Sequence, residues 1–219
     1  MNGSDKKNHG KFIVGLTGGF GSGKTAAANL FEELGAFVVD SDRIARETFL
    51  KGSEPYPALA RLFEGRDVQD AKGLNRKKIA AIVFCEPKFL AKLEAIVHPY
   101  VFQRVEEEIF EAADKLVLVE VPLLYESGFQ TFCDRVIVVA ARPEAVRRRL
   151  EEKGFSASEI EARGKAQIPL EEKIKKADEV IENSGNLKET RRQVEKIWKK
   201  LQFLLKEKGE KTRQCQEKE

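Results

Sequence analysis

Cysteine, histidine and long apolar runs are all scarce in this 219-residue chain. Its three cysteines, Cys85, Cys133 and Cys215, are far apart and form no C-x-x-C pair, and only two histidines accompany them. This composition excludes a disulfide scaffold and a cysteine–histidine zinc motif. No apolar run approaches the length of a membrane span, and Met1–Gly10 lacks the apolar core of a secretory signal. We therefore expect a cytoplasmic protein without a membrane segment.

An excess of charge of one sign is absent as well. The 39 basic and 36 acidic residues nearly cancel, leaving a net charge of +3, and they are interspersed along the chain. Such a balance argues against nucleic acid as a partner. The length suits one domain with a smaller subdomain or lid.

Short apolar segments alternate with helical segments along the chain, which is typical of a parallel sheet covered by helices. The predicted strands are Phe12–Leu16, Ala36–Val39, Leu116–Val121, Arg135–Ala140 and Glu179–Ile181. Because they are rich in Val, Ile and Leu, they suit strands buried on both faces. We predict an α/β fold of three layers with a five-stranded parallel sheet.

The spacing of apolar residues also predicts how the chain is divided. One domain covers residues 11–205, with an almost wholly helical insertion at about 41–114 between the second and third strands. Residues 1–10 are expected to be a disordered extension. After a last helix with an apolar stripe, the Lys/Glu/Gln-rich residues 206–219 are expected to be a disordered tail.

The most informative stretch is the glycine-rich run Gly18–Thr25, which fits G-x-x-x-x-G-K-[ST]. A predicted strand precedes it and a predicted helix over Thr25–Leu34 follows, which is the setting of a loop that wraps the phosphates of a nucleoside triphosphate. Lys24 is expected to reach the β- and γ-phosphates, and the Thr25 hydroxyl to bind Mg²⁺. The predicted nucleotide-binding residues of this loop are Gly19, Phe20, Gly21, Ser22, Gly23, Lys24 and Thr25.

The loop alone does not decide between nucleotide-dependent classes. A GTPase needs N-K-x-D to read guanine, and the chain has none. Asp70–Gly73 matches D-x-x-G, but it follows no strand and is interpreted as a turn. A kinase, by contrast, needs an acid near the acceptor hydroxyl, cations over the phosphates and a means of excluding water.

Acidic candidates occur at the ends of two predicted strands, where a parallel sheet binds its ligands. Asp40 and Asp42 follow the second strand, and Glu120 and Glu126 lie at or after the third. The alternative for Asp42 is a structural role as N-cap of a helix over Arg43–Leu50. The two roles are compatible.

Cationic candidates follow the fourth strand. They are Arg147, Arg148, Arg149, Lys153, Arg163 and Lys165. A lid over about 147–170 could bring such side chains onto the triphosphate. The alternative is a solvated helix face paired with neighbouring glutamates. His98-Pro99 is a further candidate, although a lone histidine is more often structural and a proline is typical of a helix start.

Five motifs, taken in order, resemble dephospho-CoA kinases. They are Thr17–Thr25, Val39–Arg46, His98-Pro99, Val121–Glu126 and Ala177–Gly185. The resemblance covers about residues 11–205. It implies a nucleotide-kinase-like fold with a core, a helical CoA subdomain and a lid. It also implies that ATP, with Mg²⁺, phosphorylates the 3′-hydroxyl of the dephospho-CoA ribose in the last step of coenzyme A synthesis.

The resemblance also implies roles for particular residues. Asp42 matches the general base, and Arg149 matches the lid arginine. Arg46 and His98 lie where the family holds dephospho-CoA. Asn183 and Gly185 fall where the family approaches the adenine of ATP. A monomer is expected, with a homo-oligomer as the alternative.

Two positions depart from the family pattern. A second lid arginine is Lys153 here, which keeps the charge but loses the planar guanidinium fork. Glu120 stands where many members have Asp, and no role is assigned to it.

Two other functions stay open: a kinase of another small hydroxyl compound or nucleotide, and a nucleotide-dependent switch without an acceptor.

Overall fold

The computed structural model describes residues 10–216, and their side chains except those of residues 84, 87 and 211–216. The chain forms two compact units. One contains Met1–Val39 and Ile109–Glu219, and the other is Asp40–Glu108. The predicted extension 1–10 lies outside the described residues except for Gly10, which is in a turn.

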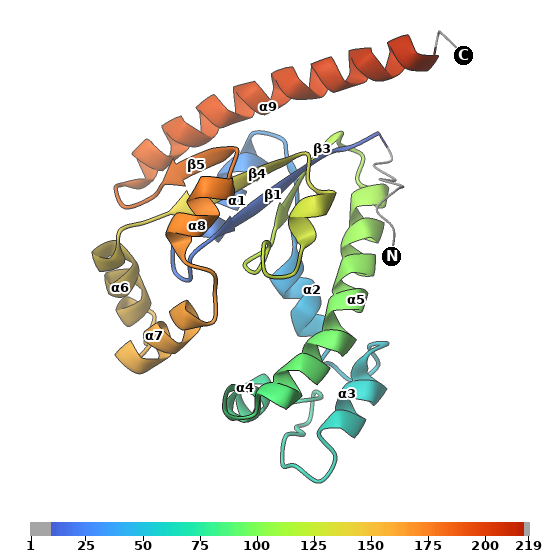
Figure 1. Ribbon diagram of the computed structural model, residues 1–219, viewed down its shortest axis with the longest axis vertical. Helices are drawn as coiled ribbons and strands as arrows, with labels where there is room; N and C mark the ends of the chain where they lie inside the picture. The colour runs from blue at the N-terminus through green and yellow to red at the C-terminus, as the bar shows by residue number, and fades with distance from the viewer. Residues whose placement is uncertain (1–9, 217–219) are drawn as a thin grey trace. The chain divides into compact units, whose positions relative to one another are not determined.

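The first unit is built on the predicted five-stranded parallel sheet (Figure 1). The strands are β1 (Phe12–Gly18), β2 (Phe37–Asp40), β3 (Leu116–Glu120), β4 (Arg135–Ala140) and β5 (Glu179–Glu182). Their order in the sheet is β2-β3-β1-β4-β5, so β1 is central and pairs with β3 and β4. The predicted α/β fold class is confirmed, and the carboxyl ends of β1, β3 and β4 meet at one edge of the sheet.

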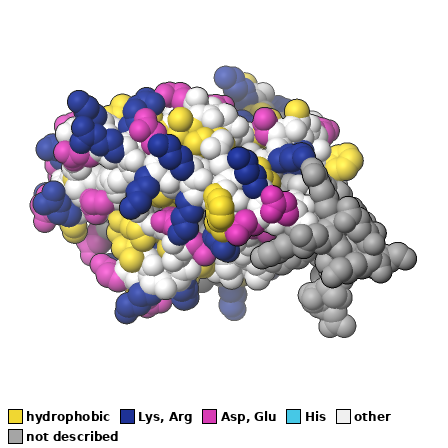
Figure 2. All heavy atoms as spheres, turned by 90° about the horizontal axis from the view of Figure 1, so that it is seen from above, with side chains coloured by type: hydrophobic (Ala, Val, Ile, Leu, Met, Phe, Trp, Pro, Cys, Tyr) yellow, Lys and Arg dark blue, Asp and Glu magenta, His cyan; other side chains and the backbone are white. Residues whose placement is uncertain are grey.

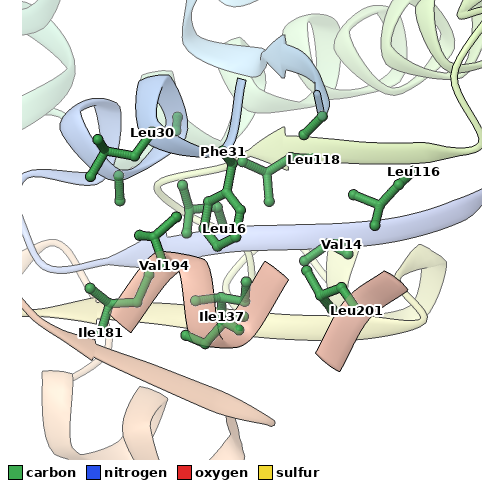
Figure 3. Packing of buried hydrophobic residues seen from close by; sticks show 14 of the residues in the cluster. Val14, Leu16, Leu30, Phe31, Leu116, Leu118, Ile137, Ile181, Val194 and Leu201 are labelled. Atoms are coloured by element: carbon green, nitrogen blue, oxygen red, sulfur yellow. The ribbon is translucent and has the colours of Figure 1, made fainter. Parts of the chain in front are cut away.

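Four helices pack on the strands of this sheet: α1 (Lys24–Glu33), η1 (Phe129–Phe132), α8 (Leu170–Lys176) and α9 (Leu187–Gln216). Two further helices, α6 (Pro143–Glu152) and α7 (Ala157–Lys165), follow β4 and lie beyond the strands (Figure 1). Side chains alternate along β1, so Val14 and Leu16 enter the core under α1 and α9, as Figure 3 shows. A Cβ atom on Gly15, on the opposite face, would lie 2.5 Å from Leu124 and 2.8 Å from the Cys133 sulfur. Both layers therefore pack tightly on the central strand.

The last helix differs from its prediction at its carboxyl end. Its apolar stripe is buried as expected, with Val194, Ile197 and Leu201 in the core. However, the helix continues through Gln216, whereas the composition predicted a disordered tail from residue 206. Lys, Glu and Gln are good helix formers and extend a helix that packing has already nucleated. Lys208 also anchors this end, because its ammonium donates to both carboxylate oxygens of Asp134 at 2.7 and 2.9 Å.

The second unit is mainly helical. Its helices are α2 (Ser41–Glu47), α3 (Tyr56–Leu62), α4 (Arg76–Cys85) and most of α5 (Pro87–Glu111). Pro99 lies inside α5 and not at a helix start, which corrects the interpretation made from the sequence. An internal proline costs about 3 kcal/mol, but the apolar spacing continues past it, and Val97, Val101 and Val105 are all buried. Burial along this face offsets the break in the hydrogen-bond ladder.

Charged side chains of both signs lie next to one another on the face seen in Figure 2, in keeping with the interspersed charges of the sequence. None of the described helices is long and apolar enough to cross a bilayer.

Candidate active site

The predicted phosphate loop, Gly18–Thr25, connects the end of β1 to the start of α1 and is called the P-loop below. Gly21 and Gly23 have φ angles of +76° and +93°, a region that favours glycine. Gly23 stands at the N-cap of α1, so the first amides of this helix follow the loop directly. Such amides and the helix dipole favour an anion at this position. The strand–loop–helix setting is as predicted.

Close packing explains the glycines further. A Cβ atom on Gly18 would lie 2.2 Å from the Val139 carbonyl oxygen, and one on Gly21 would lie 2.7 Å from Leu150. By contrast, a Cβ atom on Gly19 would meet no atom within 4 Å. The loop therefore rests on β4 and α6 at some positions and is open at Gly19.

Lys24 folds back over the loop. Its ammonium donates to the Gly19 carbonyl at 3.2 Å and lies 3.5 Å from that of Gly18. A cation is thus held beside the loop amides, where a phosphate would lie. This placement suits the predicted contact with the β- and γ-phosphates.

Glu120 is a site residue to which sequence reasoning assigned no role. It is the last residue of β3, is 7% exposed, and accepts a hydrogen bond of 2.9 Å from the Thr25 hydroxyl. Hydroxyl and carboxylate oxygens are ligands that Mg²⁺ accepts. The pair therefore fits a magnesium ion shared with a triphosphate. In the part of the chain that the structure describes, no group of three or more His, Cys, Asp or Glu forms a metal site.

Arg149 and Asn183 converge on the backbone of the P-loop. The Asn183 amide donates to the Ser22 carbonyl at 2.8 Å, and the Arg149 guanidinium reaches that carbonyl at 3.4 Å and the Asn183 carbonyl at 2.6 Å. Thr190 in turn donates to the Asn183 side chain at 2.7 Å. Thus α6, the loop after β5 and the P-loop are brought together.

Gly185 is exposed in the loop after β5, and a Cβ atom there would lie 2.0 Å from the Glu189 carboxylate.

The segment after α6 also contacts the P-loop. The ring of Phe20 meets that of Phe155 edge-on at 5.3 Å, and the Arg163 guanidinium lies 5.0 and 5.1 Å from the two ring centres. Such cation–π contacts add about 0.5–1 kcal/mol at exposed sites. The tip of the P-loop is therefore tied to α7 and to the turn before it.

Other cations of this segment lie on exposed helix faces and not against the P-loop. Arg147 and Lys165 form exposed ion pairs with Glu151 and Glu161, each four residues away on the same helix. For these two residues the solvated-face interpretation holds. Lys153 is exposed at the C-cap of α6.

Asp42 and Arg46 belong to the second unit, on α2. The N-cap of this helix is Asp40, whose carboxylate accepts from the Arg43 amide at 3.0 Å, so the alternative capping role considered for Asp42 is wrong. Asp42 is exposed in the first turn. Arg46 pairs with Asp40 at 3.0 Å. One guanidinium nitrogen of Arg43 donates to both carboxylate oxygens of Glu108, at 2.6 and 2.8 Å, and this contact raises the pKa of Arg43 above its usual value.

His98 and the D-x-x-G stretch are the remaining sequence candidates. His98 is half-buried on α5, with its ring 6.2 Å from that of Phe102. The Asp70 carboxylate accepts from the amides of Lys72 and Gly73, at 2.9 and 3.0 Å. This closes a turn, which confirms the interpretation of Asp70–Gly73.

Comparison with known proteins points to one family. Residues 12–189 match the family model described as dephospho-CoA kinase. A protein of Aquifex aeolicus named dephospho-CoA kinase is 40% identical over 190 residues, which cover 86% of this chain and 96% of that protein. One of Bacillus cereus with the same name is 39% identical, covering 85% and 96%.

Solved structures are similar as well. A crystal structure of a Thermus thermophilus protein has a TM-score of 0.77 at 37% identity, covering 85% of this chain and 95% of that one. The dephospho-CoA kinase of Campylobacter jejuni has a TM-score of 0.64 at 26% identity, covering 86% and 96%.

Proposed function

The chain belongs to the dephospho-CoA kinase family, whose reaction is the ATP-dependent phosphorylation of dephospho-CoA, and we propose that this chain acts on the 3′-hydroxyl of the ribose. The observation that carries the proposal is the convergence of Lys24, Arg149 and Asn183 on the P-loop. Cations and aligned amides at one loop favour the charges of a transferring phosphoryl group.

Each residue at the P-loop has a proposed part. Lys24 binds the β- and γ-phosphates beside the loop amides. Arg149 stabilises charge on the transferring group, and its two hydrogen bonds orient the guanidinium for this purpose. Thr25 and Glu120 hold Mg²⁺, which when bound offsets the negative charge of the phosphates.

Asp42 is proposed as the general base. Its carboxylate orients the ribose hydroxyl and takes its proton while the oxygen attacks the γ-phosphorus in line. The bond from that phosphorus to the bridging oxygen breaks, and ADP leaves. Because Asp40 serves as the cap of α2, the carboxylate of Asp42 is not needed for capping.

We propose that residues of about 147–170, which include the second half of α6 and all of α7, act as a lid, and that Arg46 and His98 bind dephospho-CoA. Lid closure brings cations to the phosphates and keeps out water that would hydrolyse ATP. Asn183 and Gly185 lie by the adenine. A cytoplasmic monomer is the proposed form.

An acceptor assay tests this function. ADP formation is measured with dephospho-CoA, with other nucleosides and nucleotides, and without acceptor. We expect rapid turnover with dephospho-CoA only. Preference for another hydroxyl compound would indicate a different kinase, and hydrolysis independent of any acceptor would indicate a nucleotide-dependent switch.

A further inference from the structure

Lys173 is a fully buried lysine on α8 that the proposed mechanism does not use. Its side chain is 0% exposed, whereas its neighbours Lys175 and Lys176 on the same helix are exposed. A charge is costly to bury unless it is paired and hydrogen-bonded. Its partners therefore indicate what the residue holds in place.

The Lys173 ammonium donates to two acceptors, and both lie in the loop after β3. The Glu126 carboxylate is 2.8 Å away and the Pro122 carbonyl 3.0 Å away. The Glu126 side chain is itself only 18% exposed. Water screens such a pair little, so its geometry is held more firmly than that of a surface pair.

The same acceptors also bind two other segments. The oxygen of Glu126 that pairs with Lys173 accepts from the Ile168 amide at 2.9 Å. Ile168 lies where the chain returns from α7 to α8. The Pro122 carbonyl accepts a hydrogen bond of 3.2 Å from the hydroxyl of Thr17, which directly precedes the P-loop.

Lys173 thus joins the return end of the lid segment to the strand that carries the P-loop. A lid closes completely only if the end of the segment that does not move is held in place. If that contact is lost, we expect the lid to close incompletely. We propose that Lys173 is a positioning residue that, with Glu126, anchors the base of the lid so that closure excludes water from the γ-phosphate. This inference rests on the proposed kinase function.

The experiment measures how far the consumption of ATP is coupled to phosphorylation of the acceptor. In transfer, the phosphoryl group goes to the acceptor oxygen, and the acceptor proton is released. In the leak, water takes the place of the acceptor, and ADP and inorganic phosphate form. The ratio of inorganic phosphate to phosphorylated product, measured with ATP and dephospho-CoA both present, does not depend on how much of the enzyme is folded. A merely structural role would leave this ratio unchanged.

Lys173→Met is the variant, and Lys175→Met, an exposed position on the same helix, is the matched control. We expect the ratio to rise at least about threefold in Lys173→Met, because an incompletely closed lid admits water, and to stay at the wild-type value in Lys175→Met. An unchanged ratio in folded Lys173→Met would overturn the inference.

A second variant covers the case in which Lys173→Met does not fold. Glu126→Leu combined with Lys173→Met removes both charges, and such paired replacements are often tolerated. The ratio should rise in this variant too, and a wild-type ratio there would also overturn the inference. A wild-type enzyme that transfers no phosphate to dephospho-CoA would instead refute the proposed function, so the two failures are distinct.

Discussion

The hydroxyl of Thr25 donates a 2.9 Å hydrogen bond to Oε1 of Glu120, which joins the start of α1 to the carboxyl end of β3. These residues are 95 positions apart in the chain. Their oxygens lie beside the loop that we expect to hold a triphosphate, so the pair is the proposed magnesium site.

Glu120→Gln should weaken the binding of Mg²⁺ at this site without abolishing ATP binding. The amide keeps the size of the side chain and loses its charge, so the Mg²⁺ concentration for half-maximal turnover should rise by about tenfold, equivalent to about 1.4 kcal/mol. Turnover is measured over a magnesium titration. Glu33→Gln, at an exposed position of α1, is the control, and the same rise in both variants would argue against a specific role.

Arg149→Lys should lower kcat by about 10- to 1000-fold, because lysine keeps the charge but cannot reproduce the two directed hydrogen bonds of the guanidinium. Steady-state kinetics at saturating ATP measure the effect. Arg147→Lys changes an exposed arginine of the same helix, and its kcat should stay near that of the wild type. Equal kcat values for the two variants would remove Arg149 from the mechanism.

Asp42→Asn should reduce kcat by at least about 100-fold while ATP still binds, because the amide cannot take the hydroxyl proton. Rapid-quench turnover and calorimetric ATP binding measure the two quantities. Asp40→Asn is the matched variant, since asparagine caps helices as well as aspartate does. Its kcat should change little. Near-normal turnover in Asp42→Asn would reject the base assignment.

Asn183→Ala should destabilise the protein by about 1–3 kcal/mol, since it removes a buried donor to Ser22 and leaves the Thr190 hydroxyl only its longer hydrogen bond of 3.4 Å to the Asn186 carbonyl. Urea unfolding without nucleotide measures the free energy. Asn29→Ala, at an exposed position of α1, should cost much less. A loss no greater than in that control would show that the buried contacts contribute little.

The features that could be predicted from the sequence, mainly the P-loop and the strands, depend on residues that are close together in the chain. The glycine run with its flanking strand and helix lies within one short stretch, and the strands have distinctive apolar composition. The pairs Thr25–Glu120 and Lys173–Glu126 could not be predicted, because each depends on segments brought together only by the sheet order. The acidic residue at the end of β3 was the available signal for Glu120.

Two errors have a common physical cause. At Pro99 and after residue 206, local preference indicated a helix boundary, and the structure continues the helix. Burial of Val97, Val101 and Val105 on one helix, and the bond of Lys208 to Asp134 on the other, outweigh the local preference. The capping residue of α2 was misplaced by two positions because Asp40 and Asp42 are chemically identical.

The most direct test of the account compares dephospho-CoA with its 3′-deoxy analogue as acceptors of the γ-phosphate of ATP. We expect dephospho-CoA to be converted to a product with a new phosphate on the 3′-oxygen, identified by phosphorus NMR, and the analogue to bind without being phosphorylated. Phosphorylation of the analogue, or a product carrying the phosphate at another position, would contradict the proposed reaction.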